Sequence, residues 1–128
     1  MTSAFGRALR SLRETRGLTL REVATLASVD HAYIYRLETG EKESPSTEVG
    51  GKLSKVLRAS KRDQAILEHV AQIKDIDPDL VAYVLDQPDV QFEEFATAAG
   101  TRLRGARPQP AVLIARARRM LAEDDSDG

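Results

Sequence analysis

The segment of residues 18–40, LTLREVATLASVDHAYIYRLETG, constrains the fold most because it contains two helix starts separated by one short break. Thr19 can cap a following helix, and Glu22 completes a capping box. Apolar residues then follow at helical spacing, at Leu20, Val23, Ala24 and Ala27. A break at residues 28–29 precedes Asp30, which can cap a second helix. The segment therefore predicts two short helices joined by a tight turn.

The second of these helices, residues 31 to about 38, has one apolar and one largely polar face. Ile34 and Leu37 lie three residues apart and can face a core. The positions left on or near the surface are His31, Ala32, Tyr33, Tyr35 and Arg36. Gly40 can end the helix in a left-handed conformation. Two helices joined in this way form a helix-turn-helix, the layout that places a recognition helix in the major groove of DNA.

The rest of the chain predicts further helices and no strands, because no segment alternates between apolar and polar residues. Apolar stripes occur at Phe5, Ala8, Leu9 and Leu12, at Val49, Leu53, Val56 and Leu57, and at Ile66, Leu67, Val70 and Ile73. Others occur at residues 80–85, 90–99 and 113–121. We therefore expect an all-α fold. A helix-turn-helix bundle of about five helices in residues 1–62 precedes a small helical dimerisation domain in residues 63–122 and a disordered acidic tail in residues 123–128.

The sequence LTxxEVA, the later YIYRLExG and the proline-serine helix start at residues 45–46 together resemble the Cro/CI-type (XRE) helix-turn-helix family. The resemblance implies that bases are read by His31, Ala32 and Arg36, flanked by Tyr33 and Tyr35. Arg36 is the best candidate for reading a guanine. The resemblance assigns Thr19, Thr39 and Ser46 to backbone phosphates, and we expect Arg21 and Lys42 to contact phosphates as well. It also implies a partly buried ion pair between Arg13 and Glu38.

Three features depart from the family pattern. Leu20 stands where the family usually has a phosphate-binding glutamine, and Ser28 stands where it usually has a turn glycine. Glu41 and Glu43 put negative charge where basic residues commonly meet the DNA backbone. These residues predict a modest non-specific affinity for DNA.

The formal net charge of −1 hides a strong asymmetry along the chain. Residues 1–62 carry 12 basic and 7 acidic residues, residues 63–100 carry 1 and 9, and residues 101–128 carry 6 and 4. The positive region coincides with the predicted helix-turn-helix, as expected if only this half meets phosphate.

The composition argues against several other classes of protein. The chain has no cysteine and two distant histidines, so we expect no metal site and no cofactor. It has no apolar run long enough for a membrane span, no signal-peptide pattern and no recognisable catalytic constellation. We therefore expect a cytoplasmic protein that is not an enzyme.

Residues 101–110, TRLRGARPQP, are basic, contain Gly and Pro, and predict a loop. With the LVAYVLDQPD stretch, the sequence LRGARP resembles the C-terminal region of the DdrO family of damage-response repressors. The resemblance implies a homodimeric repressor that a separate IrrE-type zinc metallopeptidase inactivates by cutting between Leu103 and Arg104. The cut would detach the predicted dimerisation stripe of Leu113, Ala117, Met120 and Leu121.

Other interpretations of these segments remain open. Arg36 can pair with Asp30 or Glu38 instead of reading a base, and the basic loop can be a plain linker. The chain can also be an antitoxin or a phage-type repressor whose C-terminal half binds a partner protein without being cut.

Overall fold

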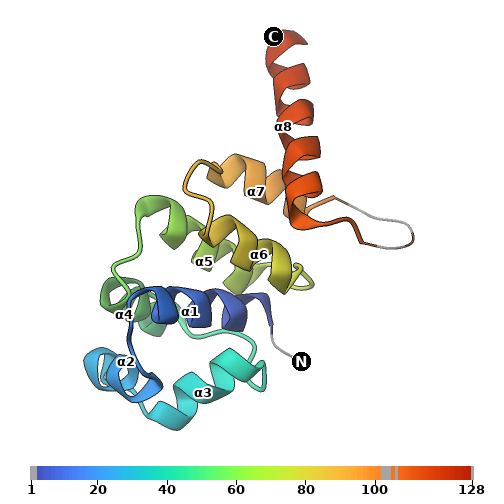
Figure 1. The fold of residues 1–128 in the computed structure, drawn as a ribbon. Coiled ribbons are helices and arrows are strands. Elements are labelled where there is room, and N and C mark those ends of the chain that lie inside the picture. The colour runs from blue at the N-terminus through green and yellow to red at the C-terminus, as the bar shows by residue number, and fades with distance from the viewer. Residues whose placement is uncertain (1–2, 102–104, 106, 128) are drawn as a thin grey trace.

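A computed structural model of the chain describes residues 3–101, 105 and 107–127 (Figure 1). The eight helices in these ranges are α1 (Ala4–Thr15), α2 (Leu20–Ala27), α3 (His31–Thr39), α4 (Thr47–Val56), α5 (Lys61–Gln72), α6 (Pro78–Leu85), α7 (Phe92–Ala99) and α8 (Pro110–Asp127). The described residues contain no strand. The predicted all-α fold is therefore confirmed.

Short polar side chains determine where most of these helices begin. A side-chain oxygen accepts a hydrogen bond from a first-turn N–H group at Ser3, Thr19, Asp30, Ser46, Ser60 and Asp77. The capping box of Thr19 and Glu22 is complete. Gly40 follows α3 with a φ of 85°, the left-handed conformation that glycine adopts without strain. The helix starts predicted at Thr19 and Asp30 and the end at Gly40 are confirmed.

The first helix, α1, lies at the centre of the fold and packs against α3, α5 and α6. Its apolar stripe of Phe5, Ala8, Leu9 and Leu12 is buried. Gly6 is buried in the same helix, and a Cβ atom there would collide with the backbone carbonyl groups of Leu37 and Glu38. The missing side chain therefore lets α1 approach the last turn of α3 closely.

One apolar core runs through both halves of the chain, from Ala4 in α1 to Ala117 in α8. The domain boundary expected at residues 62–63 falls inside α5. Next to this boundary, the Arg62 guanidinium donates to the backbone carbonyl groups of Gln87 (2.6 Å) and Val90 (2.9 Å) and pairs with Asp63 (2.9 Å). These bonds attach the start of α5 to the connection between α6 and α7.

The prediction that Ile73 belongs to the core is wrong. Ile66, Leu67 and Val70 are buried in α5, but the Ile73 side chain is 49% exposed. Because α5 ends at Gln72 and Ile73 has extended backbone angles, its side chain leaves the helical stripe.

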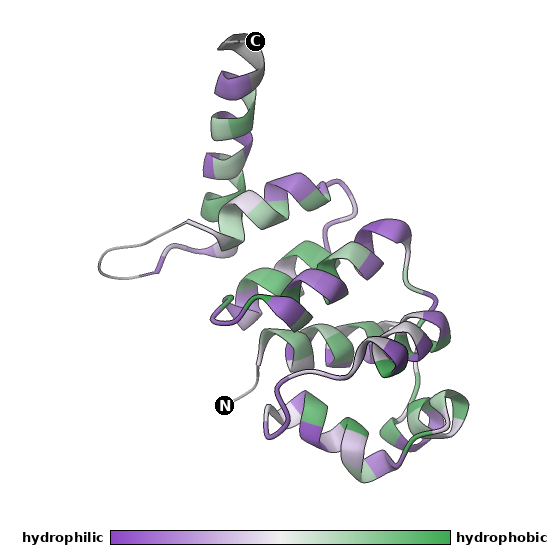
Figure 2. Cartoon of the chain, turned by 180° about the vertical axis from the view of Figure 1, so that it is seen from behind, coloured by the Kyte–Doolittle hydropathy of each residue, from purple (hydrophilic) through white to green (hydrophobic). Residues whose placement is uncertain are grey.

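The buried residues of the last helix, α8, lie in its first half. Leu113, Ile114 and Ala117 are buried where α8 packs against α7 and α6. Arg118 adds ion pairs to Glu94 in α7 (3.0 Å) and to Asp89 just before it (3.2 Å). The second half of α8 projects away from the other helices (Figure 1), and Figure 2 shows apolar segments continuing along it.

The structure differs from expectation at both ends of α8. The helix begins at Pro110, the last residue of the predicted loop, where a proline at the first helical position loses no backbone bond. It then continues to Asp127, although the acidic composition predicted disorder from residue 123. Residues 110–122 already form a helix rich in alanine, so each added residue extends existing helix rather than nucleating a new one.

Candidate nucleic-acid interface

The second and third helices are joined by a turn that Ser28 forms in the left-handed conformation, with φ 58° and ψ 43°. The Val29 N–H group closes the turn by donating to the Ala24 carbonyl oxygen at 2.9 Å. The side chain of Asp30 then accepts from the Ala32 N–H group at 3.0 Å and starts α3. Ser28 thus adopts the conformation for which glycine is the usual residue, at some cost in backbone strain.

The third helix presents two different faces. Ile34, Leu37 and Glu38 are buried against the rest of the bundle. His31, Tyr35 and Arg36 are exposed, and Ala32 is half-buried beside them. No carboxylate is paired with Arg36 within the described residues, although sequence analysis left pairs with Asp30 and Glu38 open. The Asp30 carboxylate lies 3.6 Å from the Nδ1 atom of His31 instead, and the Glu38 carboxylate is bound to Arg13.

Tyr33 occupies a different environment from Tyr35. It is half-buried and packs against the apolar core, and burial raises the pKa of its phenol group. The Lys42 ammonium group lies over the Tyr33 ring, 4.8 Å from its centroid. This cation–π contact holds the loop after α3 against that helix. Of the two tyrosines, Tyr35 is therefore the more accessible to a ligand, with 54% of it exposed.

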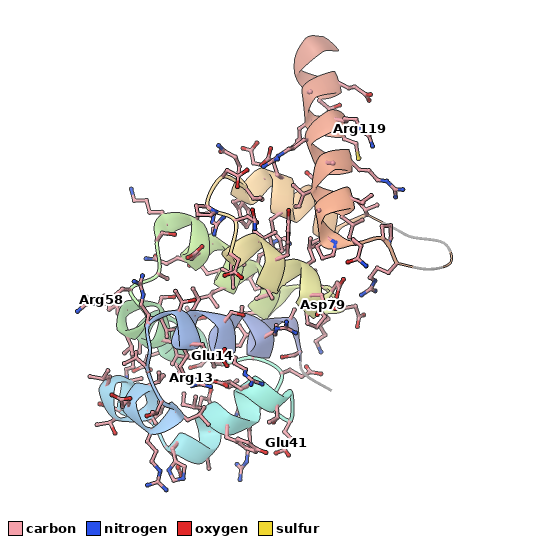
Figure 3. All side chains as sticks on the ribbon, viewed as in Figure 1. Arg13, Glu14, Glu41, Arg58, Asp79 and Arg119 are labelled. Atoms are coloured by element: carbon pink, nitrogen blue, oxygen red, sulfur yellow. The ribbon has the colours of Figure 1, made fainter. Side chains whose placement is uncertain are left out.

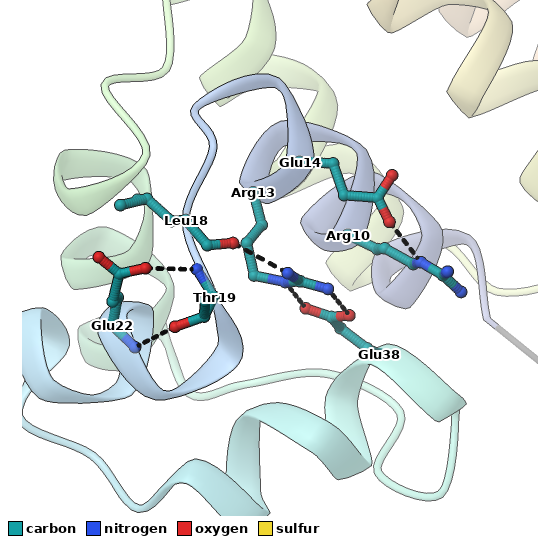
Figure 4. A network of polar contacts seen from close by, with 7 residues as sticks. All are labelled: Arg10, Arg13, Glu14, Leu18, Thr19, Glu22 and Glu38. Carbon is teal, nitrogen blue, oxygen red and sulfur yellow. Dashed lines mark hydrogen bonds and ion pairs between the residues drawn. The ribbon is translucent and has the colours of Figure 1, made fainter.

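A buried ion pair fixes the other end of α3 (Figure 4). Arg13 in α1 donates to both carboxylate oxygens of Glu38, at 2.7 and 3.0 Å, and to the Leu18 carbonyl oxygen at 2.9 Å. The two side chains are only 14% and 7% exposed. The hydrogen bonds from Arg13 to Glu38 raise the pKa of the guanidinium, although burial acts in the opposite direction. One arginine thus holds α1, the end of α3 and the start of the segment leading into α2.

The residues expected at phosphates lie at helix ends around α3. Thr19 is exposed, and its hydroxyl oxygen accepts from the Glu22 N–H group at 3.1 Å. Ser46 is exposed in the same role at the start of α4, and its hydroxyl oxygen accepts from the Val49 N–H group at 3.3 Å. Helix starts of this kind favour anions through their free N–H groups. Arg21 is exposed in the first turn of α2, and Thr39 is half-buried in the last turn of α3.

Two glutamates of the loop after α3 differ in their surroundings. The carboxylate of Glu43 pairs with Lys74 at 2.8 Å, and this hydrogen bond raises the pKa of the lysine. Glu41 is exposed near the end of α3 (Figure 3). Lys74 could not be predicted as the partner because it lies 31 positions after Glu43, in the connection between α5 and α6. Part of the negative charge expected to repel DNA is therefore neutralised.

The four residues predicted to form a dimer interface are not equivalent. Leu113 and Ala117 are 3% and 1% exposed because they already pack within the chain. Met120 is 49% exposed, and Leu121 is half-buried beside it. Val112, which the prediction omitted, is 43% exposed on the same helix. The large apolar side chains that α8 leaves exposed are therefore Val112 and Met120.

The described residues bring together no group of three histidine, cysteine or acidic side chains that could hold a metal ion. In the same residues, no helix has the length and apolar character needed to span a membrane. The predicted cleavage residues Leu103 and Arg104 lie outside the described residues.

Comparisons with known proteins agree with this geometry. The family model of the helix-turn-helix domain matches residues 4–67, which are half of the 128-residue chain. Over 55 residues the chain is 40% identical to the HTH-type transcriptional repressor RghR of Bacillus subtilis (strain 168). The matched segment covers 43% of this chain and 41% of that repressor. The residues matched by the family model include α1 to α4 and the start of α5, so the chain belongs to the helix-turn-helix domain family.

Proposed function

We propose that this chain is a transcriptional repressor that binds specific DNA sequences as a homodimer on palindromic operators. The observation that carries the proposal is the exposed face of α3, where His31, Tyr35 and Arg36 project while Ile34 and Leu37 anchor the helix. The similarity to a protein named as a transcriptional repressor supports the regulatory part. A cytoplasmic location is part of this proposal.

In the proposed complex, α3 enters the major groove and the helix starts at Thr19 and Ser46 meet phosphates on either side. Arg36 reads a guanine because its planar guanidinium can donate two hydrogen bonds to the base edge. Tyr35 and His31 reach neighbouring bases, and Ala32 allows the helix to approach them closely. Tyr33 and Lys42 support the helix from the flanking loop, since they already contact each other.

Replacing Arg36 by alanine should weaken binding to a selected operator by about 1–3 kcal/mol, because it removes a bidentate base contact. Binding to random duplex should change much less. The matched control is Arg21→Ala, which removes an exposed arginine expected at phosphate and should lower both affinities alike. Fluorescence anisotropy measures the affinity of each variant for the operator and for a scrambled duplex. An equal loss for both duplexes in Arg36→Ala would mean that Arg36 contacts only the backbone.

A second copy of the chain is the partner that we propose for the projecting half of α8. The stripe that buries Leu113 and Ala117 within the chain continues to Leu121, with the exposed Met120 beside it. Because one recognition helix reads only a half-site, two copies joined in this way bind a palindrome far more tightly than one.

Met120→Glu should convert a dimer into a monomer, because it places a charge in the centre of the proposed interface. The substitution should leave the fold intact, since Met120 is exposed in the single chain. Ala122→Glu is the matched control, as Ala122 is exposed on the opposite side of the same helix. Sedimentation equilibrium gives the mass. A wild-type chain that is already monomeric would contradict the homodimer and favour the antitoxin or phage-type alternative, in which α8 binds another protein.

Cleavage of the connection between α7 and α8 is the proposed means of releasing repression. The resemblance of LRGARP to damage-response repressors supports it, with an IrrE-type zinc metallopeptidase as the enzyme and damage-response genes as the targets. After a cut between Leu103 and Arg104, α8 would be held only by its own contacts. These include the apolar contacts of Leu113, Ile114 and Ala117 and the ion pairs of the exposed Arg118 with Asp89 and Glu94. Loss of α8 would remove the proposed dimer surface.

Leu103→Asp should produce a repressor that still binds its operator but resists the peptidase, because the change alters the residue on one side of the expected bond. Incubation of both proteins with an IrrE-type peptidase, followed by mass spectrometry of the products, locates any cut. Cleavage of the variant at the wild-type rate would refute the assignment of the bond.

A further inference from the structure

The positive charge of the helix-turn-helix half is not concentrated on the side that carries α3. The cations expected to meet DNA there are Arg21, Arg36 and Lys42, and the acidic residues of the same segment are Glu22, Asp30, Glu38, Glu41, Glu43 and Glu48. The net charge of +5 in residues 1–62 must therefore come largely from elsewhere.

Most of the excess lies where α4 ends and α5 begins. Residues 49–62 contain five basic residues and no acidic residue. Two of the five have carboxylate partners, since Lys52 pairs with Glu48 and Arg62 with Asp63. The other three, Lys55, Arg58 and Lys61, are exposed, and none has a carboxylate partner among the described residues. We call these three residues and the neighbouring Arg16 the basic flank.

Arg16 connects the basic flank to the start of α2. Its guanidinium donates to the carbonyl oxygens of Leu57 (2.8 Å) and Arg58 (2.7 Å), which are uncharged acceptors, and it thereby holds the end of α4. Arg16 also lies three residues before Thr19, which caps α2 and is an expected phosphate position. The basic flank is therefore adjacent to one edge of the proposed DNA surface.

The backbone turns the basic flank outward. Arg58 has a positive φ of 51°, and its side chain projects away from the molecule at the junction of α4 and α5 (Figure 3). Leu57 and Ala59, on either side of it, are buried. The large apolar residues exposed on the described surface are Leu26, Tyr35, Ile73, Val112 and Met120, and none belongs to the flank.

We infer that the basic flank binds the phosphate backbone of duplex DNA beyond the bases that α3 reads. The inference deepens the proposed function and rests on it. A protein partner is disfavoured because protein interfaces have apolar centres, which the flank lacks, whereas contacts to DNA backbone are polar and positively charged. The flank thereby supplies sequence-independent affinity that the mixed charges around α3 do not.

The double variant Arg58→Ala with Lys61→Ala tests this inference in the full chain. Its affinity for a random-sequence duplex of about 30 base pairs is measured by fluorescence anisotropy at several salt concentrations. Each lost phosphate contact lowers the salt slope by about 0.9, so the slope should fall by about 2. The matched control is Arg116→Ala with Arg119→Ala, which removes the same charge from exposed positions on α8 and should keep the slope. Arg58→Lys with Lys61→Arg retains both charges and should also keep it.

An unchanged salt slope in the flank variant would overturn the inference. An equal fall of the salt slope in the α8 control would also overturn it, because the effect would then reflect net charge alone. Loss of self-association with unchanged DNA binding would assign the flank to a protein partner instead. The random duplex makes this test independent of any operator. If selection from random DNA enriches no sequence while the flank variant still loses slope, the proposed sequence-specific function fails and the flank assignment stands.

Discussion

The ion pair between Arg13 and Glu38 is the contact on which the arrangement of the helix-turn-helix depends. Its two nearly buried side chains join α1 to the last turn of α3, and the same arginine holds the Leu18 carbonyl group ahead of α2. Charge-assisted bidentate bonds of this kind have a defined geometry as well as a favourable energy. At the same place, Gly6 lets the two helices come close. The orientation of the exposed face of α3 is therefore set from the central helix of the fold.

In the function proposed above, three regions contribute to DNA binding. The face of α3 offers few cations and several neighbouring glutamates, so it suits discrimination between sequences better than strong attraction to DNA. In our account, the basic flank adds attraction, and the projecting half of α8 brings two reading faces together. The Glu43–Lys74 pair joins the second half of the chain to the loop beside α3.

The sequence was sufficient to predict features that depend on neighbouring residues. The capping box at Thr19, the cap at Asp30 and the left-handed Gly40 follow from short-range hydrogen bonding and backbone conformation. Features that depend on distant contacts were missed. Leu113 and Ala117 repeat at helical spacing whether they face a second copy or α7, so periodicity could not identify their partner. The pairing of Lys74 with Glu43 and the clustering of the basic flank could not be predicted, because both depend on which helix ends meet in space.

The most direct test of the central claim compares the stabilities of two variants by urea denaturation. Glu38→Gln leaves Arg13 nearly buried without its counter-ion and should lower the free energy of unfolding by about 2–4 kcal/mol. Glu14→Gln is the control, because Glu14 pairs with Arg10 on α1 at the same distance of 2.7 Å but in an exposed position. Its loss should change the free energy of unfolding little. Equal effects of the two substitutions would contradict the claim that the Arg13–Glu38 pair holds α3 in place.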